Sequence, residues 1–173
     1  GVAQAAEIPR ATARRMLLTL VELGYVAQDA DRFSLTPRLL ELGFVYLNSR
    51  PFYRAAQDVL EALSDEINEL CSLSVLDGHE TVYLVHVQGR EFLRRGMGVG
   101  TRLPAYATSI GRVLLAGLPP DEAERILKAA RPQPPTPSTR TDLPALRLAI
   151  EQARSDGYCL VVEELVAGVI GMS

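Results

Sequence analysis

Three arginines, Arg10, Arg14 and Arg15, stand close together near the start of the chain. A guanidinium can contact phosphate oxygens or donate two hydrogen bonds to guanine, so arginines clustered at the start of a helix are typical of DNA recognition. A helical wheel over residues 10–23 places them on a polar side, opposite an apolar side. The candidate DNA contacts are Arg10, Ala11, Thr12, Arg14 and Arg15 on this helix and Arg32 farther along the chain.

A second pattern could bind an anion. Thr108 is placed to cap a helix over residues 109–116, and the Ser109 hydroxyl lies beside the first amides of that helix. The start of a helix attracts negative charge, which suits the carboxylate of a small organic acid. Tyr106 could stack on an aromatic ring, with apolar walls from Leu103, Ala105, Ala107 and Ile110. The alternative is an ordinary capped helix packed against a sheet.

Two other site types fit poorly. Residues 107–111 differ by one residue from the G-x-S-x-G motif of serine esterases, but such a triad needs a histidine after the serine. Both histidines, His79 and His86, precede Ser109. Glycines 96, 98 and 100 lack the spacing and the strand–helix setting of a dinucleotide-binding loop. The sequence therefore favours a protein that is not an enzyme, and it predicts no cofactor.

The composition is that of an ordinary globular protein. The 173 residues are 47% hydrophobic and 23% charged, with a net charge of −3. Residues 1–38 carry a local charge of +1, from five arginines against four carboxylates. No apolar run in the sequence approaches the length of a membrane span, and Cys71 and Cys159 suggest neither a disulfide nor a metal site. We therefore expect a cytoplasmic protein without a membrane partner.

The first 36 residues are predicted to form a winged helix-turn-helix. Helices over residues 2–7 and 10–23 meet at a tight corner, with Glu7 where glycine is usual, and residues 25–35 are predicted to form a hairpin. Pro9 suits the first position of the second helix. A helix normally precedes Val2 in such a domain, so we infer that this first helix is absent from the chain. The side of the second helix expected to pack comprises Ala13, Met16, Leu17, Leu20 and Leu23.

The rest of the chain alternates helices and strands in a pattern typical of an α+β fold. An apolar helix over residues 38–48 is either buried within the chain or a linker through which two copies pair. Further helices are predicted over residues 52–70, 109–116, 119–130 and 142–155. Strands are predicted over residues 71–75, 81–87, 92–95, 97–103, 158–162 and 165–171.

Several stretches resemble a known family, and together they cover nearly the whole chain. Residues 11–17 (ATARRML), 23–26 (LGYV) and 33–43 (FSLTPRLLELG) resemble the IclR family of bacterial transcriptional regulators. Residues 99–116 (VGTRLPAYATSIGRVLLA) are similar to the branch that controls aromatic-acid catabolism through the β-ketoadipate pathway.

The resemblance implies a domain organisation and partners. It implies a winged helix-turn-helix over residues 1–36, a linker helix over residues 37–50 and a GAF-like effector-binding domain with an antiparallel sheet over residues 51–173. The partners would be double-stranded operator DNA, a small aromatic or β-ketoadipate-type acid, and further copies of the chain in a homodimer or tetramer. Phe92 and Glu163 join the candidate effector contacts. The family has a further strand between residues 158–162 and 165–171, so we expect residues to be missing near 162–165.

These observations predict a DNA-binding regulator whose C-terminal domain senses a small organic acid. The alternatives are a DNA-binding interaction protein without a ligand and a serine esterase. A ligand-dependent thermal shift would separate a sensor from a protein that only bridges partners.

Overall fold

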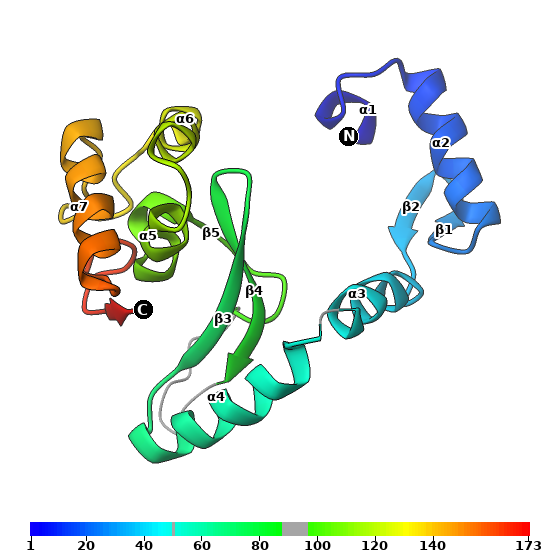
Figure 1. The fold of residues 1–173 in the computed structure, drawn as a ribbon. Coiled ribbons are helices and arrows are strands. Elements are labelled where there is room, and N and C mark those ends of the chain that lie inside the picture. Colours follow the sequence, from blue (N-terminus) through cyan, green and yellow to red (C-terminus); the bar gives the residue numbers. More distant parts are fainter. Residues whose placement is uncertain (50, 88–96) are drawn as a thin grey trace. The chain divides into compact units, whose positions relative to one another are not determined.

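The computed structural model describes residues 1–49, 51–87 and 97–173 (Figure 1). The chain divides into two compact units, Gly1–Phe52 and Tyr53–Ser173. Among the described residues, no helix has both the length and the apolar character needed to span a membrane.

The N-terminal unit contains the predicted helix-turn-helix and wing. Helix α1 spans Val2–Ala5 and helix α2 spans Arg10–Glu22, with Pro9 just before α2 rather than at its first position. Strands β1 (Val26–Asp29) and β2 (Arg32–Leu35) pair antiparallel. Glu7 adopts a φ of 52°, so the corner between the helices takes the left-handed conformation without a glycine. Because this corner uses residues 6 and 7, α1 is shorter than predicted.

Arg38, which follows the wing, contacts the C-terminal end of α2. Its Nη1 donates to the Leu23 carbonyl at 2.7 Å, and its guanidinium lies 5.2 Å from the centre of the Tyr25 ring. Thr36 Oγ1 donates to the Gly24 carbonyl at 2.6 Å. Carbonyls at a helix C-terminus need donors of this kind. Arg38, which contributes to the local positive charge in the sequence, is therefore engaged within the unit.

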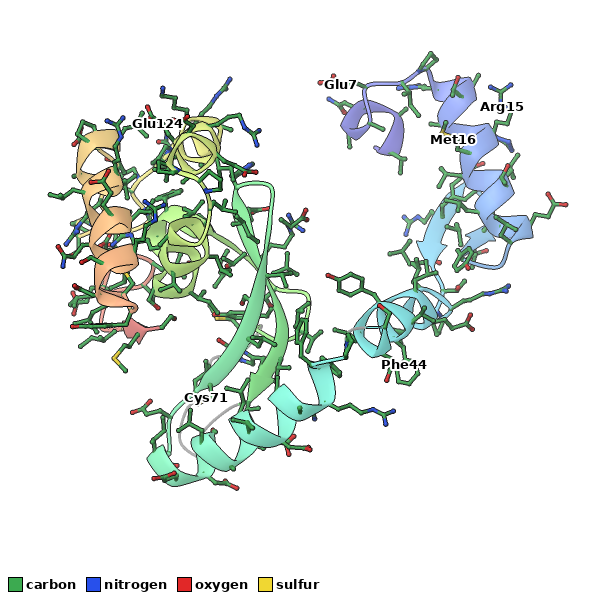
Figure 2. All side chains as sticks on the ribbon, viewed as in Figure 1. Glu7, Arg15, Met16, Phe44, Cys71 and Glu124 are labelled. Carbon is green, nitrogen blue, oxygen red and sulfur yellow. The ribbon has the colours of Figure 1, made fainter. Side chains whose placement is uncertain are left out.

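Helix α3 (Leu39–Asn48) exposes its apolar side chains. None of its residues is buried, and Leu40 is 76% and Phe44 68% exposed (Figure 2). The structure therefore does not favour the alternative in which this helix is buried within the chain. A large exposed apolar surface is typical of an interaction site.

The C-terminal unit begins with a helix on a hairpin. Helix α4 (Tyr53–Ile67) packs against strands β3 (Cys71–Asp77) and β4 (Glu80–Val87), which pair antiparallel around a turn at Gly78 (Figure 1). The register shifts between Leu73 and Ser74, which leaves Leu84 as the extra residue of a β-bulge in β4. The short strand β5 (Arg102–Pro104) pairs with the start of β4.

Helix α5 (Ser109–Ala116) lies at the centre of the remaining elements. It follows the short helix η1 (Ala105–Ala107) and contacts α6 (Pro120–Ala130), α7 (Leu143–Asp156) and β3. Strands β6 (Leu160–Val162) and β7 (Ile170–Met172) pair antiparallel, and β7 contacts α5. Leu115 of α5 and Leu146 of α7 are fully buried in the apolar core between these helices.

Three predicted strands are shorter in the structure, and one of them, predicted over residues 158–162, is β6, which begins at Leu160. The strand predicted over residues 97–103 begins only at Arg102, because the preceding residues turn: the Thr101 amide donates to the Gly98 carbonyl at 3.0 Å, and Gly100 has a φ of 85°. The strand predicted over residues 165–171 begins only at Ile170, because residues 163–169 form the loop from β6 to β7. This loop joins the two strands directly. The omission expected near residues 162–165 stays a prediction, and the strand predicted over 92–95, with Phe92, lies outside the described residues.

Candidate DNA-contacting helix and effector site

The first turns of α2 present the predicted DNA contacts to solvent. Arg10, Ala11, Arg14 and Arg15 are exposed and Thr12 is partly exposed. The first turn of α2 holds no acidic residue, and Figure 2 shows the Arg15 side chain projecting from the helix. Arg32 is exposed at the start of β2, on the wing. The structure thus groups five of the six residues on one helix and puts the sixth on the adjoining hairpin.

The apolar side of α2 is only partly covered. Ala13 is buried and Leu17 is partly buried, as expected for a packing side. However, Met16 is 55% and Leu23 51% exposed, and Leu20 is also exposed. The prediction that this whole side packs is therefore wrong for the described unit. Its neighbours, the four-residue α1 and a hairpin of two four-residue strands, are too small to cover a helix of 13 residues.

The predicted anion site lies where α5 begins. The structure confirms that Thr108 caps the helix, because its Oγ1 accepts from the Gly111 amide at 3.1 Å. Beside it, Ser109 Oγ lies 2.9 Å from Ser173 Oγ, so Ser173, the residue after β7, places a second hydroxyl at the helix start. The first amides of a helix have no acceptor within the helix. The amides of Ser109 and Ile110 are therefore the donors that a carboxylate would meet.

Gly171 allows β7 to approach the Ser109 side chain closely. A Cβ at position 171 would lie 3.0 Å from Ser109 Oγ, closer than almost all real side chains approach. Sequence reasoning missed both Gly171 and Ser173. Their contact with Ser109 joins residues more than 60 positions apart, so no local pattern could reveal it.

The other predicted effector contacts pack or form hydrogen bonds within the C-terminal unit. The Tyr106 side chain is buried, and its hydroxyl donates to the Gln133 carbonyl at 2.8 Å and accepts from the Gln133 amide at 3.1 Å. Glu163, in the loop after β6, accepts a hydrogen bond from Thr136 Oγ1 at its carbonyl. The remaining predicted contacts are buried (Ala105, Ala107) or partly buried (Leu103, Ile110). The residues that the structure brings together at the helix start are Thr108, Ser109 and Ile110.

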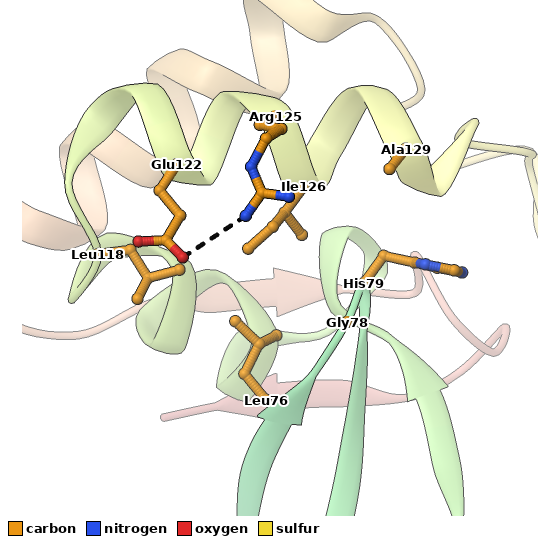
Figure 3. A pocket seen from close by; sticks show the side chains of 8 residues that line it. All are labelled: Leu76, Gly78, His79, Leu118, Glu122, Arg125, Ile126 and Ala129. Atoms are coloured by element: carbon orange, nitrogen blue, oxygen red, sulfur yellow. Dashed lines mark ion pairs between the residues drawn. The ribbon is translucent and has the colours of Figure 1, made fainter.

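A cavity of about 410 Å³ lies elsewhere, between the β3–β4 turn and α6 (Figure 3). It contains none of the predicted effector contacts. Glu122 and Arg125 form an ion pair of 3.6 Å at its edge, so the arginine charge there is already balanced. For a carboxylate, the start of α5 is the better site. The cavity is lined by Leu76, Gly78, His79, Leu118, Glu122, Arg125, Ile126 and Ala129.

A buried polar cluster lies on the β3–β4 hairpin. Ser74 is directly opposite Tyr83, and the Tyr83 ring stacks on His86 with centroids 5.1 Å apart. The bulge at Leu84 brings these two rings to one side, since residues three apart in a regular strand face opposite ways. Within the described part of the chain, Ser74 Oγ and both His86 ring nitrogens are buried without a hydrogen-bond partner. Such groups are uncommon and often mark functional sites.

The protein is expected to lose stability as the pH falls below about 6.5, because burial lowers the pKa of His86. The unfolded chain then binds the proton more readily, so stability that is full above the unfolded pKa is lost as the pH falls through the folded pKa. The His86→Gln variant should lose less stability than the wild type between about pH 7.5 and about pH 5, as measured by urea unfolding. His79→Gln, exposed beside the turn, is the control. Equal losses in wild type and His86→Gln would contradict this assignment.

Two family models match the chain. Residues 44–173 match the model described as "Bacterial transcriptional regulator IclR C-terminal", and residues 2–30 match the "IclR helix-turn-helix domain".

Curated relatives and solved structures agree with these matches. The chain is 38% identical over 164 residues to the Pca regulon regulatory protein of Pseudomonas putida, covering 94% of this chain and 56% of that protein. It is 36% identical to the p-hydroxybenzoate hydroxylase transcriptional activator of Acinetobacter baylyi, covering 99% and 65%. A structure of an IclR homolog from Microbacterium hydrocarbonoxydans, complexed with 4-hydroxybenzoate, is 29% identical with a TM-score of 0.75, covering 98% and 71%. The chain thus spans less than two thirds of the two curated relatives.

Proposed function

Because the chain belongs to the IclR family of bacterial transcriptional regulators, we propose that it is a cytoplasmic, ligand-responsive regulator of transcription that binds operator DNA. The observation that carries the proposal is the pairing of two unlike surfaces on one chain. One unit exposes an arginine-bearing helix, and the other has a capped helix start flanked by two hydroxyls. The esterase alternative is not retained, because the family consists of regulators and no histidine follows Ser109 in the sequence.

The DNA contacts would come from α2 and the wing. In a helix-turn-helix, the N-terminal residues of the second helix contact base edges in the major groove. Arg10, Arg14 and Arg15 occupy those turns, and Thr12 adds a hydroxyl. Arg32 would reach the backbone or the minor groove from the hairpin.

The effector would be a small aromatic or β-ketoadipate-type acid. Its carboxylate would accept hydrogen bonds from the Ser109 and Ile110 amides and from the Ser109 and Ser173 hydroxyls, at the end of α5 that favours negative charge. The names of two relatives point to p-hydroxybenzoate metabolism and to the Pca regulon, and a structural relative is complexed with 4-hydroxybenzoate. The test ligands are therefore 4-hydroxybenzoate, protocatechuate and β-ketoadipate.

Two copies would pair through α3, with two dimers forming a tetramer. The exposed apolar side chains of α3 support the dimer, since Leu40, Leu42, Phe44 and Val45 are each more than half exposed. A small acid in the C-terminal unit would then bias the relative placement of two DNA-reading helices, which is coupling between two sites through the dimer.

A side chain at position 171 is expected to displace Ser109 and so to weaken effector binding. Gly171→Val would place methyl groups against Ser109, while a β-branched residue suits the strand, so the protein should stay folded. Calorimetry with 4-hydroxybenzoate, protocatechuate, β-ketoadipate and pyruvate should show binding of an aromatic or β-ketoadipate-type acid by wild type, weakened about tenfold or more in the variant.

The neighbouring variant Met172→Val, at an exposed position of the same strand, is the control and should bind as wild type does. Binding of pyruvate alone would refute this effector class. A protein that binds DNA but none of these acids would support the ligand-independent alternative.

A further inference from the structure

A buried ion pair joins α5 to the loop that precedes β7. The Arg112 and Glu164 side chains are 1% and 5% exposed. The two terminal nitrogens of Arg112 donate separately to the two carboxylate oxygens of Glu164, at 2.8 Å and 2.5 Å. This two-pronged arrangement fixes both the distance and the orientation of the two side chains.

The same two residues also form hydrogen bonds with two further segments of the chain. Arg112 Nε donates to the Tyr106 carbonyl at 2.9 Å, which ties η1 to α5. The Arg140 amide donates to Glu164 Oε2 at 2.8 Å, and Thr139 Oγ1 donates to the Glu164 carbonyl. The proline-rich loop before α7 is therefore held to the same carboxylate.

Stability alone gives a weak reason for this arrangement. Removing two charges from water is costly, and replacing a buried ion pair with apolar residues of similar volume is often neutral or stabilising. What an apolar pair does not supply is a fixed geometry. Ser109 lies one helical turn before Arg112, and Gly171 and Ser173 follow the loop that contains Glu164.

We infer that Arg112 and Glu164 are positioning residues for the anion site. They set the separation between the start of α5 and β7, and so the position of the hydrogen-bonded Ser109 and Ser173 hydroxyls relative to the first amides of α5. The inference rests on the proposed effector site at the start of α5. It assigns these two residues an effect on ligand affinity that is separate from their effect on folding.

The test uses a variant that still folds but lacks the ion pair between Arg112 and Glu164. The double variant R112M/E164L replaces both charges with apolar side chains, so neither is left buried alone. Because the Tyr106 carbonyl and the Arg140 amide lose their partners, it should unfold at a lower urea midpoint than wild type but remain folded without urea. It should bind 4-hydroxybenzoate about tenfold or more weakly by calorimetry. Hydrogen exchange should be faster at the amide of Gly171, which pairs with Val161 in the β6–β7 sheet, and unchanged in β3. R102M, which breaks an exposed ion pair with Glu80, is the matched control and should change neither readout.

The possible outcomes separate a failure of the positioning role of Arg112 and Glu164 from a failure of the proposed effector site. A folded double variant with wild-type affinity would overturn the positioning role while leaving the effector site intact. If the double variant does not fold, R112K decides instead, because lysine keeps the charge but cannot bind both oxygens in a fixed fork. R112K with full affinity overturns the inference, and R112K with reduced affinity supports it. If wild type binds neither an aromatic nor a β-ketoadipate-type acid, the proposed effector class fails and this inference fails with it.

Discussion

Arg15→Ala is expected to abolish operator binding without unfolding the protein. Arg15 is exposed near the start of α2, in the part of a helix-turn-helix that meets the major groove. Loss of one arginine contact to a guanine costs about 1–3 kcal/mol. If two protomers read the DNA, the loss is roughly a hundredfold or more in affinity.

The measurement is a titration of the protein with DNA fragments from the intergenic region beside its own gene, at several salt concentrations. If Arg15 contacts a base, its removal should reduce the affinity for the operator more than the affinity for random DNA. If Arg15 contacts a phosphate, its removal should reduce both affinities equally and lower the dependence of affinity on salt concentration by about one charge. The titration therefore also decides between the two kinds of contact.

Two control variants separate recognition from folding. Glu22→Gln changes the exposed far end of α2, and Arg54→Ala removes an exposed arginine from α4 in the other unit. All three variants should keep the wild-type unfolding midpoint, and the two controls should keep operator affinity. Full affinity in folded Arg15→Ala would refute the placement of α2 in the groove.

Gly111→Ala is expected to destabilise the C-terminal unit severely. A Cβ at position 111 would lie 2.2 Å from the Ala105 carbonyl oxygen, 2.4 Å from Ala105 Cα and 2.6 Å from Thr108 Oγ1. Ala105 is buried backbone in η1, and the next carbonyl along is held by Arg112. Because neither neighbour can retreat freely, we expect a loss of about 3 kcal/mol or more in the free energy of unfolding.

Gly117→Ala provides the matched comparison at the other end of α5. Its nearest neighbour would be the Leu114 carbonyl oxygen at 3.4 Å, an ordinary contact, and its φ of −71° suits alanine. The substitution should be neutral or stabilise by about 0.4–1 kcal/mol, because alanine reduces the freedom of the unfolded chain. Urea unfolding of both variants gives the comparison. Equal stabilities would show that η1 can move away from α5.

Gly111 and Gly117 show how far local sequence predicts the effect of a substitution on stability. Helix propensity alone predicts that alanine stabilises at both positions, since glycine is unfavourable in helices. At position 111 the close approach of η1 reverses the sign. The Thr108 cap, by contrast, was predictable, because a cap involves residues three positions apart. The predicted hairpins of the wing and of β3–β4 formed for the same reason, since turn chemistry is local.

Most predicted DNA contacts were found on one helix because helical periodicity fixes which residues share a face. The residues of the proposed effector site were predicted less completely. Tyr106 has the right residue type for a ligand wall, but its hydroxyl is occupied by Gln133, which lies 27 residues away. Gly171 and Ser173 carry no recognisable motif, and only the position of β7 beside α5 reveals them.

The sequence by itself determined the type and order of the described elements, the arginine-bearing face of α2 and the capped start of α5, but it misplaced several element ends. These depend on interactions between residues a few positions apart, which residue type and spacing specify directly. Only the tertiary structure decided which groups meet across the chain: Ser109 with Ser173, Arg112 with Glu164, and Gly171 with the Ser109 side chain. Such contacts depend on how whole elements pack, so they follow from the balance of all buried groups and not from any single pattern.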